Sequence, residues 1–443
     1  MNWIMKKTEL KRYDTYKPSG LEWLGEIPAH WEIRKIKFLF KEINERSFNG
    51  EEDLLSVSQY TGVTKKSEEV NEGDFITNAN TLEGYKKVSI NDLVSNIMLA
   101  WNGSLGFSNY NGITSPAYSV YRLNSSNKVG YFHYLLRTDL YKAEFKRNSS
   151  GVVESRLRLY TENFFSISAI LPPVSEQTAI AQFLDSKTAL IDKAIELKEK
   201  QIALLKERRQ ATIHQAVTKG LNPDVPMKDS GIEWIGEIPT HWVVKKLKYI
   251  STTQNGISKS AQHFGFGFPF VNYGDVYKNT VIPLHVEGLV NSSVTDRHLF
   301  SVSEGDIFFT RTSESVEEIG LSSICMHTIS DATFAGFLIR VRPTQGSIRK
   351  NFSKYYFRSF THRSFFIKEI NLVTRASLSQ ERLKQLPVLI PPIEEQDRIA
   401  LALDEITKKM DNAINIKQQE IQKLKEYKAN LINSAVTGKI KVA

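Results

Sequence analysis

Two long stretches of the chain, residues 172–221 and 391–440, place apolar side chains at the spacing of one helix face. The second stretch starts 219 residues after the first, and the two align without a gap. Each begins with two prolines followed by a Glu-Gln pair, and acidic charge is favourable in the first turn of a helix. The pattern therefore predicts two long helices, each a rod of roughly 60 Å at ~1.5 Å per residue.

A heptad frame fits both predicted helices. One stripe contains Ala181, Thr188, Ile195 and Ile202, matched by Ala400, Thr407, Ile414 and Ile421; the other contains Leu184, Ile191, Lys198 and Leu205, matched by Leu403, Met410, Lys417 and Leu424. Two helices with the same a and d frame in one chain are expected to pair as a coiled coil. The matched core lysines, Lys198 and Lys417, are expected to fix its register at some cost in stability.

The first helix carries an additional apolar row that the second lacks. The row consists of Phe183, Leu190, Leu197 and Leu204, whose counterparts in the second helix are Ala402, Lys409, Ile416 and Lys423. Apolar side chains outside the coiled-coil seam need a further surface to cover them. The sequence leaves open whether that surface belongs to a variable region of this chain or to another protein.

A shorter repeat begins each half of the chain. Residues 17–39 and 228–250 are identical at 13 of 23 positions and share the pattern SGxEWxGEIPxHW. We call these two segments the aromatic clasps; they contain four of the six tryptophans, Trp23, Trp31, Trp234 and Trp242. A cluster of tryptophan and proline is more often a packing element than a binding site, so we interpret His30 and His241 as structural residues.

The regions between clasp and helix, residues 40–165 and 251–384, differ in sequence but share the same pattern of apolar and polar residues. Both place short apolar runs between Gly, Asn, Ser and Thr, which predicts β-strands joined by loops. Sparse landmarks align, such as Asn91-Asp92 with Gly305-Asp306 and Tyr121-Arg122 with Val341-Arg342. We predict that these two variable blocks share an α+β fold while their surfaces differ.

Composition narrows the class of partner. A chain of 443 residues is expected to form two or more domains, and its net charge of +9 indicates a polyanionic partner, of which nucleic acid is the commonest. A basic protein without such a partner is the alternative. The single cysteine, Cys325, excludes an internal disulfide and suits a reducing cytoplasm. No apolar run approaches the ~20 residues of a membrane span, and the N-terminal residues lack an apolar signal core.

Signatures of self-contained catalysis are missing from the sequence. The segment Thr437-Gly438-Lys439 lacks the upstream glycine and the following hydroxyl residue of a phosphate-binding loop, and no HExxH pattern occurs. Gly103-Ser104-Leu105-Gly106 is not a nucleophile elbow. No Asn-Pro-Pro-aromatic motif of adenine methyltransferases is present. We therefore predict no catalytic and no metal-binding residue, and interpret the chain as a reader or a scaffold.

The clasp pattern, the PPxxEQ helix start and the doubled order of block and helix resemble the specificity subunit of type I restriction–modification enzymes over nearly the whole chain. The resemblance implies an α+β fold with a pseudo-twofold repeat. Two β-rich target recognition domains would be separated by two long helices that form an antiparallel coiled coil. The implied domains are residues 1–171 and 222–390, and the implied spacer helices are residues 172–221 and 391–443.

The same resemblance implies how such a chain works. Each recognition domain would read one half of a bipartite, asymmetric DNA site, and the helices would fix the distance between the halves. The helices would also dock two modification (methyltransferase) subunits and two restriction/translocase subunits. Cofactors would bind those partners, namely S-adenosylmethionine, ATP and Mg²⁺, and none would bind this chain.

Candidate DNA-contacting residues follow from position and chemistry. Arg156 and Arg375 occupy the same place 219 residues apart, which suits a sequence-independent phosphate contact; a structural ion pair is the alternative. Arg158 adds charge beside the first of them. Base contacts are expected from residues that differ between the blocks: Tyr60, Lys65, Lys66, Lys86, Lys87 and Asn102 in the first, and Lys259, Gln262, His263, Asn272, Tyr273 and Arg311 in the second, together with Arg375.

Two other functions are compatible with parts of the sequence. A stand-alone nuclease or methyltransferase would need a metal or S-adenosylmethionine site, and the sequence offers none that we can identify. A coiled-coil adaptor with two protein-binding modules would explain the helices but not the positive charge. Salt-sensitive DNA binding discriminates this adaptor from a DNA reader, because phosphate contacts give a steep dependence on salt.

Overall fold

A computed structural model describes residues 11–68, 81–153, 157–313, 318–369 and 376–442. The chain divides into two compact units. The first unit contains the chain up to residue 198 together with the residues from 419 onward, and the second contains residues 199–418. Both boundaries fall inside the two long helices, α4 (Val174–Lys219) and α10 (Ile393–Val436), so each helix contributes one half to each unit.

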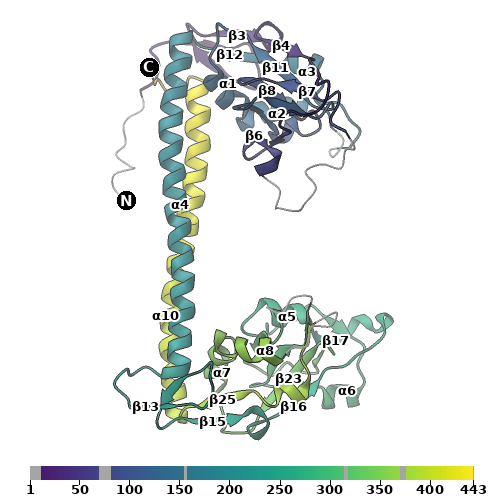
Figure 1. The fold of residues 1–443 in the computed structure, drawn as a ribbon, viewed down its shortest axis with the longest axis vertical. Helices are drawn as coiled ribbons and strands as arrows, with labels where there is room; N and C mark the ends of the chain where they lie inside the picture. Colours follow the sequence, from purple (N-terminus) through teal and green to yellow (C-terminus); the bar gives the residue numbers. More distant parts are fainter. Residues whose placement is uncertain (1–10, 69–80, 154–156, 314–317, 370–375, 443) are drawn as a thin grey trace. The chain divides into compact units, whose positions relative to one another are not determined.

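In the first unit, the beginning of α4 lies against the end of α10 (Figure 1). The Lys198 ammonium is 2.5 Å from a carboxylate oxygen of Glu420, and Lys428 is 2.7 Å from Asp192. Residue numbers rise along one helix as they fall along the other, so this half of the pair is antiparallel. The stripe residues Leu184 and Ile191 are buried between the helices and the rest of the unit.

The second unit repeats these cross-helix contacts at the equivalent positions. Lys417 donates to the side-chain oxygen of Gln201 at 2.6 Å, and Arg209 is 2.5 Å from Asp411. The first of these contacts matches the pair made by Lys198, and the second matches the pair made by Lys428. The coiled coil expected from the heptads, and the antiparallel direction implied by the resemblance, are therefore confirmed in each unit. The two core lysines reach polar partners on the opposite helix.

The first unit is built around an antiparallel four-stranded sheet in the order β4, β11, β8, β9. These strands are Phe40–Ile43, Ser119–Leu123, Asp92–Ser95 and Leu105–Phe107. The clasp supplies β1 (Tyr16–Pro18), β2 (Glu26–Pro28) and β3 (Glu32–Lys35), and β3 pairs with β12 (Ser168–Leu171). The remaining strands are β5 (Leu55–Ser58), β6 (Gly62–Lys65), β7 (Lys86–Val88) and β10 (Gly112–Thr114).

Short helices complete the first unit. They are α1 (Val129–Leu136), α2 (Asp139–Arg147) and α3 (Thr161–Ser166), with single 3-10 turns η1 (Ile36–Phe38), η2 (Lys66–Glu68) and η3 (Ala100–Asn102). The helix α1 stands between the long helices and the sheet (Figure 1).

The second unit has a sheet of the same order and direction: β16, β23, β19, β21. These strands are Ser251–Asn255, Leu338–Pro343, Ile307–Thr310 and Ser322–Ile324. Its clasp supplies β13 (Met227–Asp229), β14 (Glu237–Pro239), β15 (Val243–Lys246) and η5 (Leu247–Tyr249), and β15 pairs with β25 (Pro387–Ile390).

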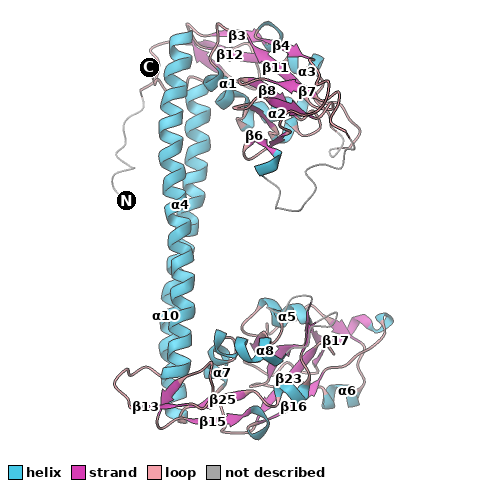
Figure 2. Cartoon of the chain, in the orientation of Figure 1, coloured by secondary structure: helices cyan, strands magenta, loops and turns pink. Residues whose placement is uncertain are grey.

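The other strands of the second unit are β17 (Phe264–Val271), β18 (Leu289–Val290), β20 (Thr312–Ser313), β22 (Thr333–Phe334) and β24 (Ala376–Ser377). Its helices are α5 (Tyr273–Lys278), α6 (Val294–Leu299), α7 (Lys350–Tyr356), α8 (Arg363–Glu369) and α9 (Gln380–Leu383), with η6 (Ala261–His263) and η8 (Phe360–His362). Figure 2 shows the helices and strands of both units.

Each four-stranded sheet packs on both faces, because successive side chains of a strand point to opposite sides. In the first unit, Leu93 and Tyr121 join a core that includes the long helices, while Val94 and Val120 join a separate core with strands β5, β6 and β7. In the second unit, Ile307 belongs to the core that includes the long helices, whereas its neighbour Phe308 packs with β17, β18 and β22.

Two layers can therefore be distinguished in each unit, one that is alike in the two units and one that differs. The common frame comprises the clasp, the four-stranded sheet and the short helices that face α4 and α10. The divergent layer lies on the opposite face of the sheet. It is formed by β5, β6, β7 and β10 in the first unit, and by η6, β17, α5, β18 and β22 in the second. The prediction that the blocks share a fold holds for the frame and not for this layer.

Candidate nucleic-acid interface

The aromatic clasp of the first unit is organised by one carboxylate at the start of α4. Glu176 accepts hydrogen bonds from the Trp31 indole nitrogen at 3.0 Å and the Tyr13 hydroxyl at 2.8 Å, and it lies 2.6 Å from Nε2 of His30. Burial alone would raise the pKa of Glu176, but these hydrogen bonds lower it. Trp31 is fully buried, so the clasp is a packing element here.

The second unit repeats the arrangement with Glu395, which accepts from the Trp242 indole nitrogen at 3.1 Å and lies 2.7 Å from His241. The glutamine after each glutamate has an equally fixed role. Gln177 accepts from the backbone nitrogen of Lys128 at 2.9 Å and donates to the carbonyl of Pro172, and Gln396 makes the equivalent pair of bonds. The Glu-Gln pair thus joins each long helix to its clasp and its variable block.

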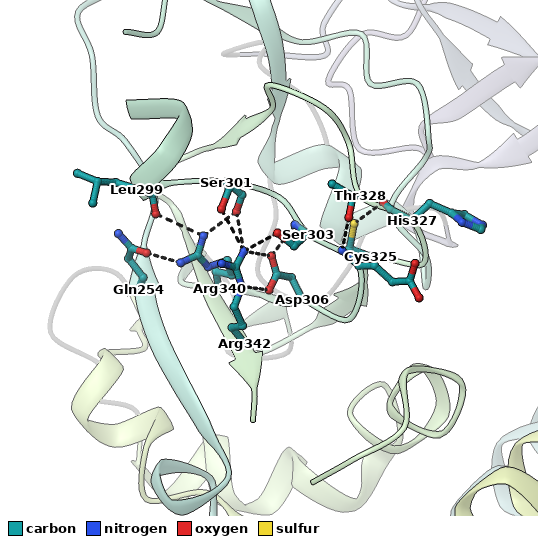
Figure 3. Close-up of polar contacts among 11 residues, drawn as sticks. Gln254, Leu299, Ser301, Ser303, Asp306, Cys325, His327, Thr328, Arg340 and Arg342 are labelled. Carbon is teal, nitrogen blue, oxygen red and sulfur yellow. Dashed lines mark hydrogen bonds and ion pairs between the residues drawn. The ribbon is translucent and has the colours of Figure 1, made fainter. Parts of the chain in front are cut away.

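The landmarks aligned in the sequence form one ion pair in each sheet. Arg342 donates to both carboxylate oxygens of Asp306, at 2.6 and 2.7 Å, and to the Ser303 hydroxyl at 3.0 Å (Figure 3). Arg122 binds Asp92 in the same bidentate way, at 2.7 and 2.8 Å. Both aspartates are buried, so the two arginines have a structural role: each neutralises a buried carboxylate of the common frame.

A second arginine beside this pair occurs only in the second unit. Arg340 donates to the carbonyl of Ser301 at 2.6 Å and also contacts the side chain of Gln254 (Figure 3). Burial, with a smaller contribution from Arg342, lowers the pKa of Arg340 to about 10. Cys325 lies near the same cluster, donates to the carbonyl of His327, and has its pKa raised to about 12, chiefly by burial. Such a thiol is a structural residue and not a reactive one.

Most candidates in the first variable block lie in the divergent layer. Tyr60 is 83% exposed at the turn between β5 and β6. Lys65 on β6 lies 2.7 Å from Asp53, and Lys87 on β7 lies 3.4 Å from Glu52, so the two lysines pair with carboxylates of consecutive residues. Lys66, the residue after β6, is half-buried.

The neighbouring lysines of β7 have opposite environments. Lys87 is exposed, whereas Lys86 is only 7% exposed, and burial lowers the pKa of Lys86. Two other candidates lie outside the divergent layer. Asn102 is exposed at the end of η3, and Arg158 is exposed where its backbone pairs with Ser150. Arg156 lies outside the described residues.

In the second block the structure gathers three candidates around one backbone segment. Lys259 donates to the carbonyl of Asn291 at 2.8 Å and pairs with Asp296 at 2.7 Å. The backbone nitrogen of the same asparagine donates to the carbonyl of His263 at 2.8 Å. Gln262 is exposed on the adjoining turn η6. These residues border β17 and β18 and form one edge of the divergent layer.

The other candidates of the second block have structural partners. Asn272 caps α5 in a reciprocal arrangement with Asp275, and Tyr273 stacks on Tyr277 with 6.0 Å between ring centroids. Arg311 donates to the carbonyl of Gly336 at 3.3 Å. Arg375 lies outside the described residues.

Two arginines that join the frame to the divergent layer, Arg137 and Arg358, are not among the candidates predicted from the sequence. Each follows the short aromatic helix of its unit, α1 or α7, and each precedes a hydroxyl residue. The alignment of Arg137-Thr138 with Arg358-Ser359 is the sequence feature that could have identified these two arginines. Among the described residues, no group of three or more His, Cys, Asp or Glu is placed to hold a metal ion. None of the helices in those same ranges is long and apolar enough to cross a membrane.

Comparison with curated proteins gives relatives along nearly the full length. The chain is 25% identical over 468 aligned residues to the putative type I restriction enzyme MjaX specificity subunit of Methanocaldococcus jannaschii, which covers 95% of this chain and 96% of that protein. It is 22% identical over 421 residues to the type I restriction enzyme EcoKI specificity subunit of Escherichia coli K12, covering 88% of this chain and 86% of the relative.

Solved structures agree in fold. A chain from a study of complex assembly and conformational transition of the type I R-M system gives a TM-score of 0.71 at 14% identity, with 94% of this chain and 99% of that chain covered. The HsdS subunit from Thermoanaerobacter tengcongensis gives a TM-score of 0.54, also at 14% identity, with 94% and 98% covered.

The sequence profile described as the type I restriction modification DNA specificity domain matches this chain twice, at residues 28–207 and 239–426. Each match runs from a clasp through a variable block into a long helix, which is the repeat seen in the structure. The two matches together cover most of the chain. The protein therefore belongs to the family of type I restriction modification DNA specificity domains and carries two copies of the domain.

Proposed function

We propose that this chain is the DNA sequence-specificity subunit of a type I restriction–modification complex and that each variable block reads one half of a bipartite, asymmetric DNA site. One observation carries the proposal: the same sheet, clasp and helix start occur twice, but each sheet supports an unlike divergent layer. A repeated frame is suited to a repeated task. Unlike surfaces on that frame are suited to unlike half-sites.

The proposed contacts are divided by the part of DNA they would touch. Base edges are read by the exposed and half-buried candidates, which are Tyr60, Lys65, Lys66, Lys87 and Asn102 in residues 1–171, and Lys259, Gln262, His263, Asn272, Tyr273 and Arg311 in residues 222–390. Arg156, Arg158 and Arg375 contact phosphates, where a basic side chain acts without regard to sequence. Burial makes Lys86 the weakest member of the predicted set.

The helices would serve as the spacer and as the docking site for partner subunits. Leu190, Leu197 and Leu204 of the additional row are 58%, 51% and 62% exposed, whereas Phe183 packs against the core of the first unit. An exposed leucine row on a helix suits a second apolar helix. We assign it to the modification subunits. Two of these and two restriction/translocase subunits would complete a cytoplasmic complex, and they would bind S-adenosylmethionine, ATP and Mg²⁺.

Exchange of the variable blocks tests the proposed reading function. Residues 251–384 would be replaced by a second copy of residues 40–165, and the chain would be assembled with its modification subunit. We expect adenine methylation to move to a site with two copies of the first half-site, because both sheets then carry the same divergent layer. Sequencing of methylated DNA gives the result. Methylation of the original site by the exchanged chain would contradict the proposal.

Replacement of Leu190 and Leu204 by lysine tests the proposed docking surface. The helix should tolerate the change, because α10 already carries Lys409 and Lys423 at the equivalent positions. We expect binding of the modification subunit to weaken by tenfold or more, since about 1.5–3 kcal/mol is gained when each leucine is buried. Analytical ultracentrifugation of the mixed subunits measures the affinity of this binding.

The matched control for the docking test is Leu284→Lys. This leucine is 53% exposed in the second variable block and belongs to neither long helix. The control should assemble normally. Equal assembly of the unaltered chain, the variant with lysine at positions 190 and 204, and the Leu284→Lys control would exclude the leucine row as a docking surface.

A further inference from the structure

Arg137 joins the common frame of the first unit to its divergent layer through backbone oxygens. It follows α1, and its guanidinium donates to the carbonyl of Leu105 at 2.6 Å, of Gln59 at 3.0 Å and of Tyr60 at 3.2 Å. Leu105 belongs to β9, the edge strand of the sheet, and residues 59 and 60 form the turn of the β5–β6 hairpin. Burial lowers the pKa of Arg137.

Two glycines give Arg137 and the hairpin room to approach the sheet. A Cβ added to Gly106 of β9 would lie 3.1 Å from the Cα of Gly62 and 3.5 Å from Arg137. Gly62, at the start of β6, has a φ of 76°, which side-chain-bearing residues rarely adopt. The hairpin therefore rests directly on the edge strand, and the guanidinium lies beside that contact.

Arg358 makes the corresponding connection in the second unit. It follows α7 and donates to the carbonyl of Ser322 at 2.8 Å, Tyr277 at 2.9 Å, Val276 at 3.1 Å and Asn279 at 3.4 Å. Ser322 belongs to β21, the edge strand that corresponds to β9. The other three carbonyls lie at the end of α5 and just after it. Burial lowers the pKa of Arg358 as well.

The two arginines are equivalent, but the elements they hold are not. The residue after each one has a hydroxyl that donates to the carbonyl three residues earlier: Thr138 to Leu135 at 2.8 Å and Ser359 to Tyr356 at 2.7 Å. Each arginine also binds its edge strand. Beyond that strand, one holds the turn of a β-hairpin and the other holds the end of a helix.

Because both arginines bind backbone carbonyls, the same side chain can hold a hairpin turn in one unit and the end of a helix in the other. Every residue offers the same acceptor whatever its side chain, and a guanidinium presents five N–H donors in a rigid plane that stays charged. An arginine that binds only carbonyls thus constrains where a segment lies without constraining its sequence. Side chains on that segment can then change while its position on the frame stays the same.

We propose that Arg137 and Arg358 are positioning residues for DNA reading, each fixing the readout element of its own variable block. The inference rests on the proposed function and adds to it the groups that orient the reading surfaces. The held elements carry residues that the sequence predicts to contact bases: Tyr60 on the hairpin turn, and Asn272 and Tyr273 at the start of α5. Reading groups must be held within about 0.5 Å to discriminate well.

The test uses the full chain assembled with its modification subunit, carrying Arg137→Lys or Arg137→Met. Methylation rates would be measured on duplexes with one altered base pair in either half-site. We expect discrimination in the first half-site to fall about tenfold or more, with discrimination in the second unchanged. Lysine should not rescue it, because one ammonium cannot span three fixed carbonyls. Arg358→Lys and Arg358→Met should show the reverse pattern.

Arg147→Met provides the matched control, since this exposed arginine of α2 bonds Glu144 in the same unit. It should leave discrimination at both half-sites intact. Hydrogen exchange at residues 59–63 should rise in the Arg137 variants while exchange in β8 stays slow, which separates a loosened hairpin from an unfolded unit.

Several results would overturn the inference. Retained discrimination at both half-sites, or equal loss at both, would exclude a positioning role. If neither substitution at Arg137 folds, the residue is needed for folding and not for reading. If the unaltered chain shows no discrimination at either half-site, the proposed function fails, whatever the variants do.

Discussion

Replacing Trp242 by alanine is expected to cost the second unit about 3–5 kcal/mol in free energy of unfolding. The indole is fully buried in the main core of that unit and donates to Glu395 at 3.1 Å. Its removal leaves a cavity and takes one hydrogen bond from a carboxylate at the start of α10. Gly220, after the end of α4, lies against the same ring, since a Cβ there would be 3.5 Å from it. Both long helices therefore lose a contact.

Urea denaturation of the full chain measures this effect, and the internal repeat supplies a comparison. Trp31→Ala should destabilise the first unit by a similar amount, because Trp31 has the same contacts with Glu176 and Gly438. Tyr249→Ala is the matched control: this ring of the second clasp is 68% exposed, and its loss should change stability by no more than about 0.5 kcal/mol. An equal cost for Tyr249 and Trp242 would show that the clasp is not a packing centre.

The long helices and their pairing could be predicted from the sequence, because a coiled coil requires apolar residues at regular heptad positions. Leu184, Ile191 and Leu403 lie in the seam or the adjoining core as the heptads required. The core positions of Lys198 and Lys417 could also be predicted from the heptads, although the residues they bind could not. Glu420 and Gln201 are equivalent positions, and only the antiparallel register shows that they face Lys198 and Lys417.

The divergent layers could not be predicted from the sequence in the same way. Their strands are short and pair with elements far along the chain, so neither partner nor register leaves a local pattern. Lys86 and Lys87 show the difficulty at the level of one residue. The two are alike in sequence, but strand alternation buries the first and exposes the second, and only the pairing of β7 with β10 decides which.

Arg137 and Arg358 were missed for another physical reason. Their acceptors are backbone carbonyls, which every residue has, so no partner side chain marks the interaction in the sequence. The ion pairs made by Arg122 and Arg342 have carboxylate partners, Asp92 and Asp306, and those four residues had already aligned as landmarks. Side-chain pairs are thus easier to predict from a repeat than contacts to the backbone.

Lengthening both helices is expected to change the spacing of the recognised half-sites without changing their sequences. Three heptads inserted after Glu199 in α4 and after Gln418 in α10 fall at equivalent points and keep the cross-helix pairs of each unit in phase. Both helices pass from one unit into the other, and 21 residues add about 31 Å to each.

That added length is close to one duplex turn of ~34 Å, so both half-sites should still present the same face of the DNA. We expect methylation at sites whose half-sites are about nine base pairs further apart, at 3.4 Å per pair. A four-residue insertion in each helix is the matched control, because it breaks the heptad phase and should abolish assembly. Sequencing of methylated DNA decides between the outcomes. Altered base preferences at unaltered spacing would mean that the helices do not set the distance, and the readers would then have to be placed by partner subunits.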